Sequence, residues 1–319
     1  MAGDLAIRPL SLGEIVDRAV AVTRASFLPL LAISFATGLP ALALHRAYAG
    51  VLSDLLESAL AFHLLPPGSA ARLGTWSTAV LLASTLLQLV ATGASASVVA
   101  PLLGGDPSPP SRAARLRRAL ELRWRLASMA LAVLAALALA ALAGAAPGAL
   151  AAWALDGVPR AFAVAAAAAG ALLALLWAVV RLALAASAAG AEGLRGLPSL
   201  RRSARLMATS PGERFADRPD VRVSAIFLVT FLLALAVSGL AALPRAGLTL
   251  AFGRGGGSPF PALPLPAEVA VGLFEAAGNA VVQPFGFVAL TVFYFDRRAR
   301  REGLDLERWA NALASPEPR

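Results

Sequence analysis

The stretch LASMALAVLAALALAALAGAAPGALAAWAL, from Leu126 to Leu155, contains no charged residue and decides the fold class of this chain. A helix that crosses the ~30 Å hydrocarbon layer of a bilayer needs about 20 predominantly apolar residues, because each residue advances it by about 1.5 Å. Gly144, Pro147 and Gly148 predict that this helix ends before Asp156. The stretch therefore predicts a transmembrane helix over approximately residues 127–146.

Five further windows of the same kind lie before and after this stretch. Across the whole chain 58% of the residues are hydrophobic and only 15% are charged, whereas soluble domains carry about 25% charged residues. The sequence thus predicts an all-α fold, a single integral membrane domain over residues 1–319 built as a polytopic transmembrane helical bundle of about six spans. The predicted spans are approximately 25–44, 76–101, 127–146, 161–181, 223–244 and 276–295.

The arginines predict the orientation of these spans. With the N-terminus inside, 22 arginines lie in the inner segments and 5 in the outer ones, while Arg181 lies in a span. Basic residues concentrate on the cytoplasmic side of membrane proteins, so both termini are predicted to be cytoplasmic. A net charge of +9 would suggest a nucleic-acid partner in a soluble protein. Because the charge here follows the sides of a membrane, no nucleic-acid partner is predicted.

Amphipathic stretches precede or follow the spans on the predicted cytoplasmic side. The first begins at Ser11 and Glu14, the spacing of a helix capping box. Similar stretches cover residues 112–125, 198–207 and 297–313, and we expect cytoplasmic amphipathic helices that lie in the headgroup region. One interpretation is simple anchoring, and the other is binding of anionic lipid at about 1 kcal/mol per surface arginine. The candidate lipid contacts are Arg117, Arg118, Arg201, Arg202, Arg297 and Arg298.

The order of these segments divides the chain into three successive units. Each unit consists of a basic interfacial helix, a span, an outer loop and a second span. Within the outer loops, Val51 to Leu65 predicts a short amphipathic helix, and the Pro- and Gly-rich stretch from Leu243 to Pro266 predicts irregular structure. The identities of the residues are too divergent to define a sequence repeat.

Polar residues inside the predicted spans are the candidate functional positions. Glu275, Asn279 and Gln283 share one face of the sixth span, and Gln88 lies on a similar polar stripe of the second. Arg181 falls at the inner boundary of the fourth span, where its long side chain reaches water, and this register keeps it away from Glu275. The two stripes predict hydrogen bonds between packed helices or, alternatively, the lining of a polar cavity open to the outside.

The sequence contains no pattern typical of an enzyme. There is no cysteine, so thiolate chemistry and disulfides are excluded. Neither an HExxH helix nor a Gly-x-Ser-x-Gly elbow occurs, and the two histidines do not follow a metal-ligand spacing. We therefore predict a protein without catalytic activity, cofactor or metal.

Three stretches carry a resemblance to a known family. They are residues 8–18 (RPLSLGEIVDR), Glu192-Gly193 with residues 202–206 (RSARL), and residues 293–307 (FYFDRRARREGLDLE). Together they resemble a bacterial family of six-span proteins related to the membrane domain of glycerophosphoryl diester phosphodiesterase. The resemblance implies a bacterial inner (plasma) membrane location and this topology. It does not imply hydrolysis, because only 24 residues, 296–319, follow the sixth span and no catalytic barrel accompanies it.

Two functional hypotheses follow from the sequence. The first is a non-enzymatic module that binds membrane-protein partners or lipids of the cell envelope, with anionic lipids of the bilayer on its cytoplasmic face. The alternative is a transporter or lipid-handling protein with a polar cavity between the second and sixth spans. Replacement of Gln88 and Gln283 by leucine distinguishes the alternative, because it would abolish transport while leaving the yield of folded protein intact.

Overall fold

The computed structural model describes residues 9–62, 68–104, 110–210, 212–252 and 263–303, and every regular element within these ranges is helical. Six helical segments are long and apolar enough to cross a membrane, so the chain is an all-α, multi-pass integral membrane protein. The elements are α1 (Leu12–Ala25), α2 (Phe27–Phe62), α3 (Ser69–Leu103), α4 (Arg112–Glu121), α5 (Arg123–Ala154), α6 (Gly157–Leu182), α7 (Ala185–Glu192), α8 (Gly196–Leu206), η1 (Phe215–Asp217), α9 (Pro219–Phe252) and α10 (Leu265–Glu302).

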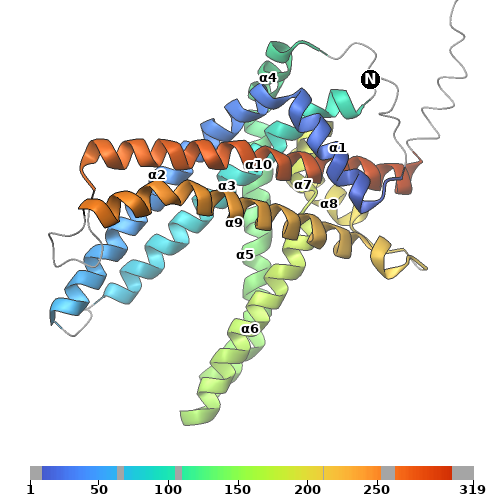
Figure 1. Ribbon diagram of the computed structural model, residues 1–319. Helices are drawn as coiled ribbons and strands as arrows, with labels where there is room; N and C mark the ends of the chain where they lie inside the picture. Colours follow the sequence, from blue (N-terminus) through green and yellow to red (C-terminus); the bar gives the residue numbers. More distant parts are fainter. Residues whose placement is uncertain (1–8, 63–67, 105–109, 211, 253–262, 304–319) are drawn as a thin grey trace, which may run out of the picture.

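The long helices form three hairpins that diverge from a common end of the molecule (Figure 1). The hairpins pair α2 with α3, α5 with α6, and α9 with α10. Four short helices, α1, α4, α7 and α8, gather where the hairpins meet, and we call this region the base. A short helix precedes the first long helix of each hairpin in the sequence, as the predicted three-unit order requires.

The short helices of the base begin where the sequence predicts. Ser11 caps α1, and the Glu14 carboxylate accepts a hydrogen bond from the Ser11 amide at 2.7 Å, which completes the capping box. Ser111 caps α4 in a similar way by accepting from the Ala114 amide. Helix α1 then buries Ile15, Ala19 and Val22 along one face. These amphipathic helices are part of the core of the base as well as of its surface.

The long helices extend well beyond the predicted spans. Helix α5 does not end at Gly144, Pro147 or Gly148 but continues to Ala154. The prediction was wrong because these small residues serve packing: a Cβ on Gly144 would collide with the backbone of Gly170 in α6. Small residues let membrane helices approach closely, and in lipid the helix is the favoured state for any backbone segment.

Two outer segments also differ from their prediction. The stretch that begins at Val51 is not a separate helix, because α2 runs without interruption from Phe27 to Phe62. The expected irregular segment is helical in its first part, since α9 passes through Pro244 and ends at Phe252. Residues 63–65 and 253–262 of these two predictions lie outside the described residues, as do the tail positions 304–313.

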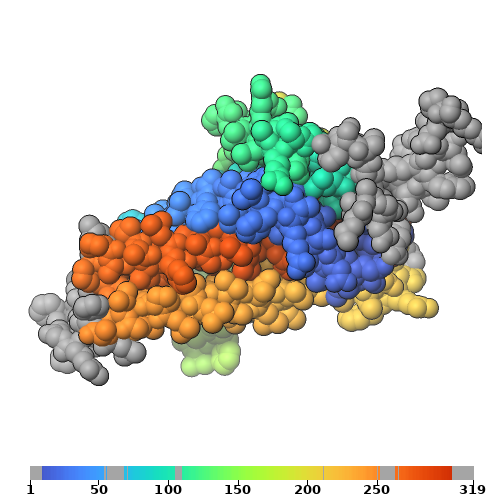
Figure 2. Space-filling model, turned by 45° about the horizontal axis from the view of Figure 1, so that its top comes forward, coloured from blue at the N-terminus to red at the C-terminus, as the bar shows by residue number. Residues whose placement is uncertain are grey.

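Helices α3 and α10 are the central elements of the bundle. On the face shown in Figure 2, α10 lies between α2 and α9. The inner parts of α3 and α10 join α1 and α7 in one hydrophobic core that includes Val98, Met129, Val288 and Phe293. The hairpin of α5 and α6 leaves this core at a different angle (Figure 1). It exposes large apolar side chains along its length, such as Leu139, Trp153 and Leu173, as expected for a lipid-facing surface.

Candidate functional site

A cavity of about 320 Å³ lies where the α5–α6 hairpin departs from the other two hairpins. Its volume is at the lower end of the range typical of small-molecule sites, ~300–1,000 Å³. The walls come from the middle of α3, α9 and α10, the first half of α5 and the last turns of α6. The lining residues are uncharged and mainly apolar: Thr85, Gln88, Leu89, Thr92, Val133, Leu137, Val179, Leu182, Ala183, Ala186, Phe227, Thr230, Ala234, Val282, Gln283, Gly286, Phe287 and Leu290.

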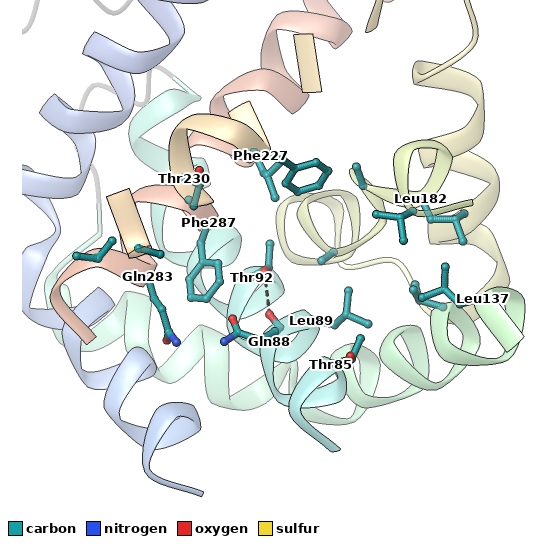
Figure 3. Close-up of a pocket in the computed structure, with 18 residues that line it drawn as sticks. Thr85, Gln88, Leu89, Thr92, Leu137, Leu182, Phe227, Thr230, Gln283 and Phe287 are labelled. Atoms are coloured by element: carbon teal, nitrogen blue, oxygen red, sulfur yellow. Dashed lines mark hydrogen bonds between the residues drawn. The ribbon is translucent and has the colours of Figure 1, made fainter. Parts of the chain in front are cut away.

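The polar groups of this lining are of two kinds. The hydroxyls of Thr85, Thr92 and Thr230 each donate to a carbonyl one turn earlier in their own helix, at 2.7–2.8 Å. The amides of Gln88 and Gln283 have no hydrogen-bond partner within the part of the chain that the structure describes. Figure 3 shows both glutamines with their amide ends on the same side of the cavity. These two amides are therefore the groups available to a bound molecule.

The two glutamines come from the polar stripes that the sequence predicts, but the rest of the sixth-span stripe does not reach the cavity. The Asn279 side chain accepts a hydrogen bond from the Ser238 hydroxyl at 3.0 Å, which joins α10 to α9. Glu275 is paired with Arg46 of α2. Glu268 forms ion pairs with Arg46 at 3.2 Å and with Arg245 at 3.0 Å, so the outer ends of α2, α9 and α10 are held together by charge.

Arg181 lies in the last turn of α6, next to the base. Its guanidinium donates to the Met207 carbonyl at 3.2 Å and lies 5.6 Å from the centre of the Trp177 ring. Glu275 is paired at the opposite ends of the hairpins, so the structure contains no ion pair between Arg181 and Glu275. Arg181 also does not line the cavity. Its contacts join the last turn of α6 to the base.

Three of the candidate lipid-binding arginines are exposed, and the other three contact groups of the protein itself. Arg117, Arg118 and Arg201 are exposed on α4 and α8. The Arg117 side chain is 82% exposed and pairs with Glu121 one turn away, an interaction that contributes about 0.3–0.5 kcal/mol on a helix surface. These three side chains remain available to a charged surface.

The other three arginines face the protein. The Arg297 side chain is 1% exposed and donates to the Leu206 carbonyl at 3.1 Å, so its assignment as a surface lipid contact was wrong. Arg202 is held between Glu192 and Glu302. Burial works to lower the pKa of the Arg202 guanidinium, but its hydrogen bonds to Glu302 and Glu192 outweigh burial and raise that pKa. Arg298 pairs with the same two carboxylates.

Sequence reasoning missed the pairing of Arg202 with Glu302 because these partners are far apart in the chain. Glu302 is 100 residues from Arg202, and no local spacing rule connects them. The cavity residues Phe227, Thr230 and Phe287 were missed for a related reason. Each is an apolar or helix-compatible residue in an apolar span, and only the angle of the α5–α6 hairpin gives them a common space.

The three stretches that carry the family resemblance meet at the base. The Leu10 amide donates to the Asp296 carboxylate at 2.7 Å. The Tyr294 hydroxyl donates to Glu192, which also accepts from Arg202 at 2.8 Å. These contacts connect the start of α1, the end of α7, helix α8 and the end of α10 within the base.

Neither a family model, nor a curated protein, nor a solved structure matches this chain. Nothing therefore links the chain to the membrane domain of glycerophosphoryl diester phosphodiesterase, and that resemblance stays a prediction.

Proposed function

We propose that this integral membrane protein binds an uncharged membrane lipid in the cavity between α3, α5, α6, α9 and α10. One observation carries the proposal: a cavity within the apolar parts of the spans has an uncharged lining and two glutamine amides without a protein partner. Gln88 is exposed at this cavity and Gln283 is partly buried, so in a bilayer both amides meet an apolar medium, where an amide without a partner is costly. A ligand with hydroxyl or ester oxygens satisfies both amides.

The character of the lining determines which lipid fits. The apolar side chains of α5, α6 and α9 suit an acyl chain, and the two amides suit the oxygens of its polar end. A phosphate or carboxylate would lose its hydration without meeting a cation, because the cavity lining contains no ionisable side chain. The lining thus favours a lipid with a neutral polar end over a phospholipid.

The proposal keeps the protein non-enzymatic and orients it in a bacterial inner membrane with both termini in the cytoplasm. The arginine distribution and the gathering of α4 and α8 at the base support this orientation. In intact cells, a cysteine replacing Asp156 at the α5–α6 turn should react with a membrane-impermeant maleimide, and one replacing Arg118 should not. The reverse pattern would invert the topology.

A matched pair of substitutions on α9 tests the cavity. Ala234 lines it, whereas Ala236 is exposed on the same helix. Ala234→Phe should fill the cavity and reduce crosslinking of a photoactivatable diacylglycerol by about tenfold, a loss of ~1.4 kcal/mol in binding. The protein is purified in phosphatidylcholine nanodiscs, and Ala236→Phe should crosslink as the wild type does. Equal labelling of both variants would rule out the cavity as the binding site.

The glutamines test the polar end of the ligand. Replacing both Gln88 and Gln283 by leucine removes the amides but keeps similar side-chain volume. We expect normal yield and weaker crosslinking of diacylglycerol, with no loss for a hydrocarbon probe that lacks oxygen. If the two probes lose affinity equally, the glutamines support the helices and do not contact the ligand. Transport, the alternative hypothesis, requires movement of the lipid between leaflets and stays a prediction.

A further inference from the structure

Arg115, on α4, carries a buried charge that no acidic side chain balances within the described part of the chain. The residue is 6% exposed, and it was not among the arginines that the sequence singled out. Its Nη1 donates to the Ser26 hydroxyl at 2.9 Å, while its Nε is buried without a partner. No carboxylate pairs with it among the described residues. Arginine offers five N–H donors, and here a neutral hydroxyl accepts one of them.

The energetic cost of this arrangement points to a missing anion. Buried charges in proteins are normally paired, because removing an ion from water costs several kcal/mol. Burial lowers the pKa of Arg115, and the neighbouring Arg112 lowers it further. Thr23, in the last turn of α1 and three residues before Ser26, also has a buried hydroxyl without a partner among the described residues. An anion with several acceptor oxygens satisfies such a group of donors.

The neighbours on α4 favour the same ligand. Arg112 and Arg118 lie three residues before and after Arg115, so the three form one row along the helix. Both neighbours are exposed. An anionic group with several oxygens at the surface of α4 can therefore contact the flanking guanidinium groups while it reaches the buried one. The phosphodiester of a phospholipid is such an anion, and its oxygens suit the planar donors of arginine.

The surroundings place this row at the level of lipid headgroups. Trp124, in the first turn of α5, is 74% exposed and lies beside the Arg123 guanidinium, 5.8 Å from ring centre to Cζ. Leu120 on α4 is 60% exposed. An exposed tryptophan next to arginine is typical of the membrane–water interface, and an exposed leucine there faces acyl chains. A phospholipid can bring its phosphate to this depth.

We propose that Arg115 binds the phosphate of an anionic phospholipid at the edge of the base, with Arg112 and Arg118 beside it. This site is distinct from the cavity, whose lining is uncharged. Its ligand is charged, whereas the proposed cavity ligand is not. The two proposals therefore stand or fail separately.

The test uses the full chain in phosphatidylcholine nanodiscs with and without phosphatidylglycerol. Native mass spectrometry should show one retained phosphatidylglycerol on the wild type. Arg115→Lys preserves the charge but not the fork of donors, and it should reduce this retention by about tenfold. Arg214→Lys, the same change at an exposed arginine before η1 that is not among the candidate lipid contacts, should retain the lipid as the wild type does. Equal retention in both variants would overturn the assignment.

Two further measurements cover the source of the phosphate and the stability of the variant. Excess inorganic phosphate should not displace the retained lipid, and full displacement would overturn a lipid ligand in favour of free phosphate. The wild-type protein alone should unfold at a higher temperature when phosphatidylglycerol is present, because a ligand that binds only the folded state stabilises it. An unchanged unfolding temperature would contradict the site without reference to any variant.

Discussion

Helices α3 and α10 differ from α6 and α9 in both polarity and burial. The spans that contain α3 and α10 have mean hydropathies of 1.7 and 1.5, and 67% of each apolar window is buried. Those that contain α6 and α9 have values of 2.4 and 2.6, and only 11% of each window is buried. In lipid, the least apolar spans are therefore the central ones, because acyl chains offer no hydrogen bonds and polar side chains need protein neighbours.

Helix α10 places polar side chains against protein neighbours or the cavity at its outer end, in its middle and at its inner end. Its outer turn pairs Glu268 and Glu275 with arginines of α2 and α9, and its middle presents Gln283 to the cavity. Its inner end places Asp296 against Arg222, with the Asp296 side chain fully buried. Helix α9 supplies partners to this series at Arg222 and Arg245, whereas no residue of α6 joins it within the described part of the chain. Matched substitutions on the two kinds of helix can test this difference.

The largest loss of stability is expected when Asp296 is replaced. It accepts from Leu10, Arg222 and Arg300, so Asp296→Asn removes the charge that balances a buried arginine. Breaking a buried pair in this way costs about 3–5 kcal/mol. Asp220→Asn, at an exposed position of α9, should cost far less. Unfolding in mixed micelles by increasing sodium dodecyl sulfate measures both, and equal midpoints would show that the charge of Asp296 does not stabilise the base.

A smaller loss of stability is expected when a buried phenylalanine is replaced, and an exposed phenylalanine serves as its control. Phe293 of α10 is fully buried, whereas Phe231 of α9 is 62% exposed. Phe293→Ala should destabilise by about 3 kcal/mol, the lower end of the range for soluble cores, because the reference state in lipid is also apolar. Phe231→Ala should change the same unfolding midpoint little. A larger loss at Phe231 would place α9 inside the bundle or in contact with another protein.

The smallest effect is expected for the hydrogen bond between Ser238 and Asn279. A double-mutant cycle with Ser238→Ala and Asn279→Ala should yield a coupling of about 0.6 kcal/mol, the average for such bonds between membrane helices. The same unfolding assay supplies the four stabilities. A coupling near zero would mean that the polar stripe of α10 depends on its cavity and charge contacts alone.

The sequence predicted the fold more closely than the site. Uncharged windows located all six spans, and the Ser11–Glu14 spacing located the start of α1. The predicted end of α5 was wrong because a glycine in a membrane helix can either end the helix or allow close packing. Only the contact of Gly144 with Gly170 shows which of the two applies. Gln88 and Gln283 were found as polar exceptions in apolar spans. Arg297 was misplaced because a basic run looks the same whether it is solvated or buried.

The sequence by itself determined that this chain is an all-α membrane protein, since the length and composition of a span depend only on the thickness and polarity of the bilayer. The order of short and long helices in three units was also readable from local patterns. Only the tertiary structure decided which polar groups meet. It placed Gln88 and Gln283 at one cavity, paired Arg202 with Glu302 and left Arg115 without an acidic partner among the described residues. Such contacts depend on the angles between hairpins, and those angles follow from packing across the whole chain.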